Sequence, residues 1–112
     1  MGTAFLATQE SAANDAHRAA IRTTAAEATV LTRAMSGRLA RGARTRTIRA
    51  IEASGFTAPF PAQNWLTGGF RTAAAKQDLG ELQSLWLGQS APLARFDAAA
   101  ELFAELAAGL PD

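Results

Sequence analysis

Few residues of this chain could carry chemistry, and the first of them stand at its beginning. Gly2 and Thr3 precede a mainly apolar run, which is the pattern of a strand end that turns into a helix. Glycine lets an anion approach the backbone closely, and free amides and a hydroxyl in such a turn can bind it. The pattern leaves two interpretations open. Met1 begins an ordinary N-terminal helix, or the chain is the tail of a larger enzyme cut at an internal methionine.

The remaining candidates for catalysis or metal binding are isolated. His17 is the sole histidine and lies in an alanine-rich segment beside Arg18. Without a second imidazole or a carboxylate cluster, it is expected to be a solvated helix residue rather than a metal ligand. No serine has the Gly-x-Ser-x-Gly setting of a nucleophile, and no glycine-rich nucleotide loop is present. We therefore expect no catalytic residue and no metal site within the chain.

A basic segment is the strongest signal that the residues give without reference to any family. No acidic residue lies between Glu27 and Glu52, and this interval holds most of the arginines. If they shared one face they could bind nucleic acid or an acidic partner. No aromatic residue stands among them, so nucleic-acid binding is the less favoured interpretation. The favoured one is that these arginines hold an irregular segment against acidic surface elsewhere in a larger fold. The six are Arg33, Arg38, Arg41, Arg44, Arg46 and Arg49.

Length and composition narrow the class of protein. The 112 residues amount to one domain at most, and a net charge of +1 gives no global case for nucleic acid or an anionic membrane. Cysteine is absent, and neither a signal peptide nor an apolar run of membrane-spanning length is recognisable. A cytoplasmic protein without membrane contact is expected. Alanine forms about a quarter of the chain, which favours helix but supplies little apolar area for a core.

Local patterns predict a mostly helical chain with long loops. A helix is expected over about residues 15–27, capped by Ser11 or Asn14, followed by a short β-branched strand at residues 29–32. Residues 36–37 should break the basic segment, and a second helix is expected over residues 43–53. These elements do not suggest a compact helical bundle.

The second half of the chain is punctuated by proline and glycine. Residues 55–63 contain two prolines and are expected to form a loop. A helix is predicted over residues 64–77, interrupted by the glycine pair at 68–69. A last helix is expected to be capped by Asp97, to run to Ala108, and to end at Gly109 in the left-handed conformation.

Four stretches of the chain resemble motifs that occur together in one enzyme family. Residues 1–11 match a Met-Gly-Thr-x-Phe-Leu-x-Thr-x-Glu-Ser segment, and residues 29–42 resemble a threonine–serine-glycine-arginine segment. Residues 59–63 match a Pro-x-Pro-x-Gln loop, and residues 84–89 match a Ser-Leu-Trp-x-Gly-Gln box. The four occur in the order found in the nitronate monooxygenases, formerly 2-nitropropane dioxygenases. The whole chain, residues 1–112, resembles the C-terminal third of such an enzyme.

The resemblance implies a fold and a chemistry. Members of the family are FMN-dependent (β/α)8 TIM-barrel enzymes with an added helical region, an α/β fold of which this chain would be an incomplete, C-terminal part. They oxidise alkyl nitronates with molecular oxygen and require no NAD(P)H for turnover. By this resemblance, Met1, Gly2 and Thr3 match the last FMN phosphate-binding turn. Trp86 and Gln89 belong to a box near the flavin pocket, where Trp86 has either a site role or a packing role.

The family's catalytic histidine and its Glu-Ala-Gly-Gly-His flavin segment would lie upstream, and His17 does not match that histidine. We therefore expect a piece of the enzyme, from a truncated gene, a frameshift or a start codon placed too late, that is inactive alone. A second chain could supply the rest of the barrel. The alternative is a small α-helical interaction module that binds an acidic partner or nucleic acid through Arg33–Arg49.

Overall fold

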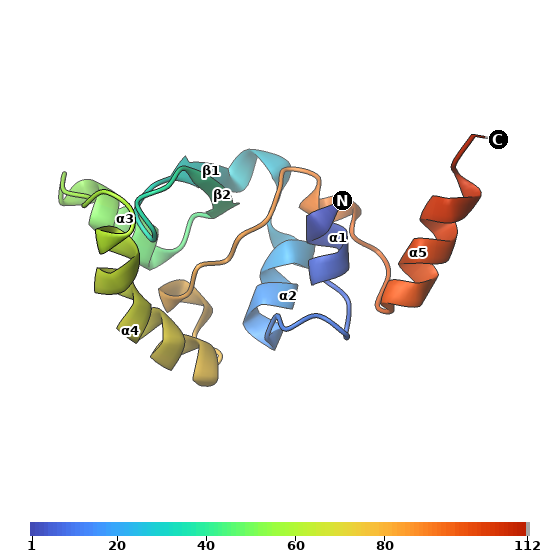
Figure 1. Ribbon diagram of the computed structural model, residues 1–112, viewed down its shortest axis with the longest axis horizontal. Coiled ribbons are helices and arrows are strands. Elements are labelled where there is room, and N and C mark those ends of the chain that lie inside the picture. Colours follow the sequence, from blue (N-terminus) through green and yellow to red (C-terminus); the bar gives the residue numbers. More distant parts are fainter. Residues whose placement is uncertain (112) are drawn as a thin grey trace.

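The computed structural model describes residues 1–111, and in them the chain forms an elongated, mostly helical body. It measures 50 × 28 × 24 Å, with α3, α4 and a β-hairpin at one end and α5 at the other (Figure 1). This confirms the expectation of helices joined by long loops. The elements are α1 (Gly2–Leu6), α2 (Asp15–Thr23), η1 (Ala26–Ala28), β1 (Thr29–Thr32), β2 (Ala40–Ala43), α3 (Arg46–Ala53), α4 (Ala62–Lys76), η2 (Gly80–Leu82), η3 (Ala91–Leu93) and α5 (Ala99–Ala108).

Helix α2 and strand β1 form where local signals predict them. The Asn14 side chain caps α2 by accepting the His17 amide proton at 3.1 Å. The helix ends at Thr23, four residues before the expected end, and the 3₁₀ turn η1 leads into β1. Strand β1 pairs antiparallel with β2, with Thr29 opposite Ala43.

Strand β2 was not predicted, because Ala, Arg and Gly have low strand propensity. Its second edge is paired as well: the Ala43 amide donates to the Leu85 carbonyl at 2.9 Å, and Leu87 donates to the Arg41 carbonyl at 3.2 Å. Backbone pairing from residues 85–87, far along the chain, therefore makes a strand of a segment that lacks its own preference.

Helix α4 is continuous, so the expected interruption at the glycine pair is wrong. Two side chains on the buried face of α4 anchor it to the hairpin loop. Gln63 donates to the Ala34 carbonyl, and the Thr67 hydroxyl donates to the Met35 carbonyl. These tertiary bonds offset the helix propensity lost at two glycines, about 1 kcal/mol each.

Helix α5 begins and ends differently from the prediction. Its N-cap is Ala98, which has no capping side chain, while the Asp97 carboxylate pairs with Arg22 of α2. A carboxylate from the N-terminal loop caps the helix instead, since Glu10 accepts the Ala99 amide proton at 3.0 Å. Gly109 has a φ of −89° and is not left-handed.

The buried core consists of two small clusters rather than one. The first joins α1, α2 and the segment after Trp86, and comprises Ala7, Ile21, Leu87 and Ala91. The second joins the hairpin loop to α3, and comprises Ala34, Met35 and Ile48. No helix within residues 1–111 is long and apolar enough to cross a bilayer.

Candidate functional site

The turn Met1–Thr3 forms the N-terminus of α1. Met1 and Gly2 are exposed and Thr3 is half-buried, so the turn faces outward from the chain. A Cβ built at Gly2 would meet no atom within 4 Å, which leaves the backbone open to a ligand. The amides of Gly2 and Thr3 lie in the first turn of a helix, where no intrahelical acceptor exists. The turn thus offers amides and a hydroxyl to an anion.

Thr3 also joins this turn to the 84–89 box. The Thr3 hydroxyl oxygen accepts the Gly88 amide proton at 3.0 Å, a contact between residues 85 positions apart. The hydroxyl proton of Thr3 remains free to be donated. Two of the four sequence motifs are therefore brought together by a single side chain.

The 84–89 box is fixed by two further segments. On one side it pairs with β2, whose Gly42 lies so close that a Cβ there would be 2.6 Å from the Leu85 carbonyl oxygen. On the other side, His17 of α2 bonds to the Trp86 carbonyl at 2.8 Å. Because a carbonyl oxygen only accepts, Nε2 of His17 carries the proton in this bond. Three separate parts of the chain therefore hold the backbone of the box.

His17 is half-buried, so the prediction of a solvated helix residue is wrong. The sequence offered no signal for its partner, a backbone carbonyl 69 residues away. No cluster of three metal-ligating side chains occurs among the described residues. Trp86 is half-buried and packs on the cluster of Ala34, Met35 and Ile48, whereas Gln89 is exposed. The indole thus has a packing role in this chain.

The basic segment divides its charges among several partners. Arg44 pairs with Glu52 at 3.7 Å, and Arg49 approaches Glu81 at 3.9 Å. Arg38 stacks 4.1 Å above the centre of the Phe60 ring. Exposed ion pairs contribute about 0–1 kcal/mol each, so these contacts position the segment more than they stabilise it. This pattern agrees with arginines that pin an irregular segment to acidic residues, here residues of the same chain.

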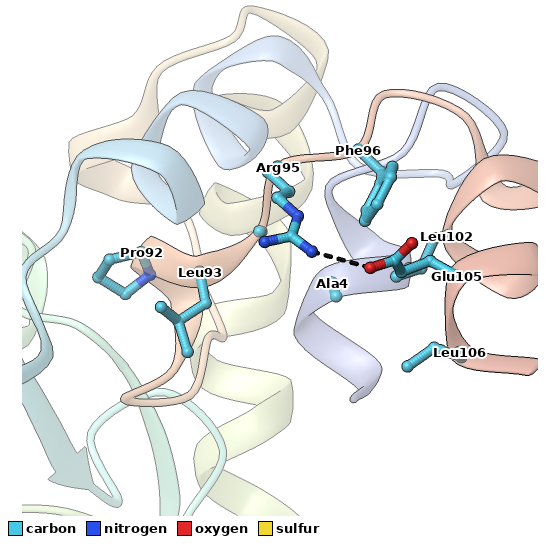
Figure 2. Close-up of a pocket in the computed structure, with 9 residues that line it drawn as sticks. Ala4, Pro92, Leu93, Arg95, Phe96, Leu102, Glu105 and Leu106 are labelled. Carbon is cyan, nitrogen blue, oxygen red and sulfur yellow. Dashed lines mark hydrogen bonds and ion pairs between the residues drawn. The ribbon is translucent and has the colours of Figure 1, made fainter. Parts of the chain in front are cut away.

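An apolar hollow of about 480 Å³ lies beside the turn, between α1, the 92–96 segment and α5 (Figure 2). Ala4, next to Thr3, forms part of its wall. An ion pair at 3.1 Å between Arg95 and Glu105 crosses it, as Figure 2 shows. A second, larger hollow of about 700 Å³ is lined by Met1, Phe5 and the outer residues of α5. Apolar surface thus flanks the turn on the α5 side.

Comparisons with known proteins agree on one family. A family model described as nitronate monooxygenase matches residues 1–109. Probable nitronate monooxygenases of Staphylococcus aureus strains JH9 and Newman are 44% identical over 95 residues, which is 84% of this chain and 27% of each relative. The chain therefore spans about a quarter of the length of the curated relatives it matches.

Two solved structures share the fold. A nitroalkane oxidase from Streptomyces ansochromogenes superposes with a TM-score of 0.86 at 40% identity, covering 96% of this chain and 31% of that one. FabK from Thermotoga maritima superposes with a TM-score of 0.72 at 28% identity, covering 96% of this chain and 35% of that one. Both are TIM-barrel enzymes, so the chain corresponds to about a third of a barrel protein.

Proposed function

Since this chain belongs to the nitronate monooxygenase family, we propose that it forms part of an FMN-dependent oxidoreductase that oxidises alkyl nitronates with molecular oxygen. In this proposal residues 1–112 are one incomplete domain, the C-terminal part of the barrel and its helical region. The missing strands come from a longer polypeptide or from a second chain. The relative lengths support this, because the chain spans only 27% of its curated relatives.

Within that enzyme, Met1, Gly2 and Thr3 hold the FMN phosphate. The amides of Gly2 and Thr3 donate to phosphate oxygens, and the Thr3 hydroxyl donates its own proton while its oxygen accepts from Gly88. The single observation that carries the proposal is this Thr3–Gly88 bond, because it holds the Thr3 hydroxyl oxygen in one position at the turn. A preorganised donor loses less entropy on binding than a mobile one.

The chain contributes binding and positioning rather than the chemical step. FMN, when bound, supplies the redox chemistry of nitronate oxidation. In this proposal His17 has a structural role, in which its Nε2–H is donated to the Trp86 carbonyl. The contacts of His17 and β2 with the 84–89 box keep Gly88 against Thr3 and so preserve the phosphate turn.

The isolated chain is too small to hold FMN by this turn. A few hydrogen bonds are worth about 1 kcal/mol each net, whereas immobilising a ligand costs several kcal/mol. We expect no tight binding of FMN and no nitronate oxidation by residues 1–112 alone. Flavin fluorescence titration with the purified chain checks this, and saturable binding at micromolar FMN or tighter would overturn it.

A chimera tests whether the chain can serve as part of a complete flavin-dependent enzyme. Residues 1–109 replace the corresponding segment of the S. ansochromogenes nitroalkane oxidase, to which they are 40% identical. The chimera is expected to fold, to bind FMN and to oxidise a nitronate with consumption of oxygen. A folded chimera that binds no flavin would contradict the proposal.

The alternative, an interaction module that acts through Arg33–Arg49, has no support among the relatives described above. Arg44 and Arg49 also pair with carboxylates of the same chain, which reduces the net positive charge available to a partner.

A further inference from the structure

Arg71 of α4 is a half-buried cation whose partners are all neutral. Its Nη1 donates to the Ser84 hydroxyl at 3.0 Å, and its Nη2 donates to the Asn64 carbonyl at 3.2 Å and to Asn64 Oδ1 at 2.6 Å. The ion pairs among residues 1–111 all involve other arginines. Partial burial of a charge without a counter-ion is unfavourable, and here it also lowers the pKa of Arg71.

Two buried donors in this region have no acceptor within residues 1–111: Nε of Arg71 and Nε2 of Gln83. Gln83 is only 6% exposed, and its Oε1 accepts from Asn14 Nδ2 at 2.9 Å, so its amide orientation is fixed. A guanidinium has five N–H groups, and three bonds are made. Both unpartnered groups are donors, and the group that they lack is an acceptor.

A hollow adjoins these donors. Two neighbouring cavities of about 400 Å³ each share Thr72, Ala75 and Gln83 as walls, and together they form what we call the α4 trough. Arg71 and Ser84 line one part and His17 and Lys76 line the other. Among residues 1–111, no aspartate or glutamate lines either cavity. The trough thus carries two positive charges, from the held Arg71 and the exposed Lys76, together with polar groups.

We propose that the α4 trough binds a small oxyanion, a carboxylate or a phosphate, with Arg71 as its principal ligand. Guanidinium groups bind both anions through paired N–H donors. Ser84 and Asn64 orient the guanidinium through their hydrogen bonds to Nη1 and Nη2. Gln83 borders the anion with its unpartnered amide group, and Lys76 supplies a second charge. The inference does not depend on the flavin role of Met1–Thr3.

Arginine side-chain NMR on the full chain tests this directly. The Nε–Hε signal of Arg71, assigned by its loss in Arg71→Lys, is followed during titration with sodium acetate or sodium phosphate. Sodium chloride at equal ionic strength is the control, and the signal of exposed Arg33 is the internal reference. A saturable shift of Arg71 alone is expected. If acetate is the anion that saturates the signal, the site binds carboxylates; if phosphate is, it binds phosphates. The absence of a saturable shift, or a shift equal to that of Arg33, would overturn the proposal.

Ser84→Asp provides the second test, because it places a carboxylate at the atom that already contacts Nη1 of Arg71. An internal anion should displace the external one and reduce affinity about tenfold or more, as expected for loss of a charge-assisted hydrogen bond. Ser84→Thr keeps the hydroxyl and should bind like the unmodified chain. Unchanged affinity in Ser84→Asp would contradict the proposal.

Discussion

Two glycines illustrate how a single residue type serves opposite purposes in this chain. Gly42 of β2 is buried against the 84–89 box, and a Cβ there would be 2.6 Å from the Leu85 carbonyl oxygen and 3.0 Å from the Trp86 ring. Gly68 lies inside α4, where a Cβ would meet nothing within 4 Å. The first glycine permits a close backbone approach, whereas the second only weakens its helix.

The same substitution should therefore have opposite effects at the two sites. Gly42→Ala is expected to destabilise the chain by about 1–3 kcal/mol, because strand and box must separate. Gly68→Ala is expected to stabilise it by about 0.4–1 kcal/mol, because the unfolded chain loses freedom. Urea denaturation followed by circular dichroism measures both. Equal effects of the two substitutions would refute the packing of the box on β2.

At the scale of elements, α5 is attached to the chain by polar contacts from distant segments. The Gln9 amide donates to the Asp97 carbonyl at 2.8 Å, Glu10 caps the helix at Ala99, and Arg22 pairs with Asp97. Leu102 is the one α5 residue that is buried within residues 1–111. The docking of α5 thus depends on a carboxylate cap that another element supplies.

This cap makes the docking of α5 dependent on pH. The Ala99 amide, as the largest influence, lowers the pKa of Glu10 below its ordinary value. A depressed pKa in the folded state means that the stabilisation is complete above the unfolded pKa and is lost as pH falls through the folded pKa. The Ala99 amide shift should therefore titrate with a midpoint below the usual glutamate range.

Glu10→Gln serves as the control, since the side-chain amide oxygen can still accept but has no charge to titrate. The Ala99 amide shift should then be independent of pH in this range. A midpoint at or above the ordinary glutamate value in the unmodified chain would show that Glu10 does not cap α5.

Elements with local signals could be predicted from the sequence, and those made by distant contacts could not. Asn14 caps α2 through an amide three residues away, and the β-branched run at 29–32 forms β1. By contrast, β2 depends on residues 85–87, and the cap of α5 comes from a carboxylate 89 positions away. The same limit applies to the site. Met1–Thr3 could be proposed as a site by resemblance, but the Thr3–Gly88 and His17–Trp86 bonds could not be predicted.

At the scale of the whole molecule, residues 1–111 enclose no single core. Its radius of gyration is 15.2 Å, whereas a compact domain of this length has about 13 Å. Trp65 and Leu66 on α4, and Phe103 on α5, each expose about two thirds or more of their surface. Exposed apolar side chains of this size are typical of surfaces that another body covers. The missing part of the barrel is the covering body in the function proposed above.

Removing exposed apolar side chains from α5, and at Leu110 just beyond its end, should therefore have little effect on the stability of the isolated chain. Phe103→Ser and Leu110→Ser are expected to reduce the binding of a hydrophobic dye without lowering the free energy of unfolding. Leu102→Ser, on the buried face, is the matched control and should cost about 2 kcal/mol or more. If substitution at the two exposed positions lowered the free energy of unfolding as much as Leu102→Ser, these side chains would already be packed in the isolated chain, contrary to this account.

The central claim is that the Thr3 hydroxyl binds the FMN phosphate, and its most direct test compares two flavins in the chimera. Riboflavin lacks the phosphate, so Thr3→Val should weaken FMN binding about tenfold while riboflavin binding is unchanged. Thr3→Ser should retain FMN affinity. If Thr3→Val weakens both flavins equally, or neither, Thr3 acts only through Gly88 and the phosphate assignment is wrong.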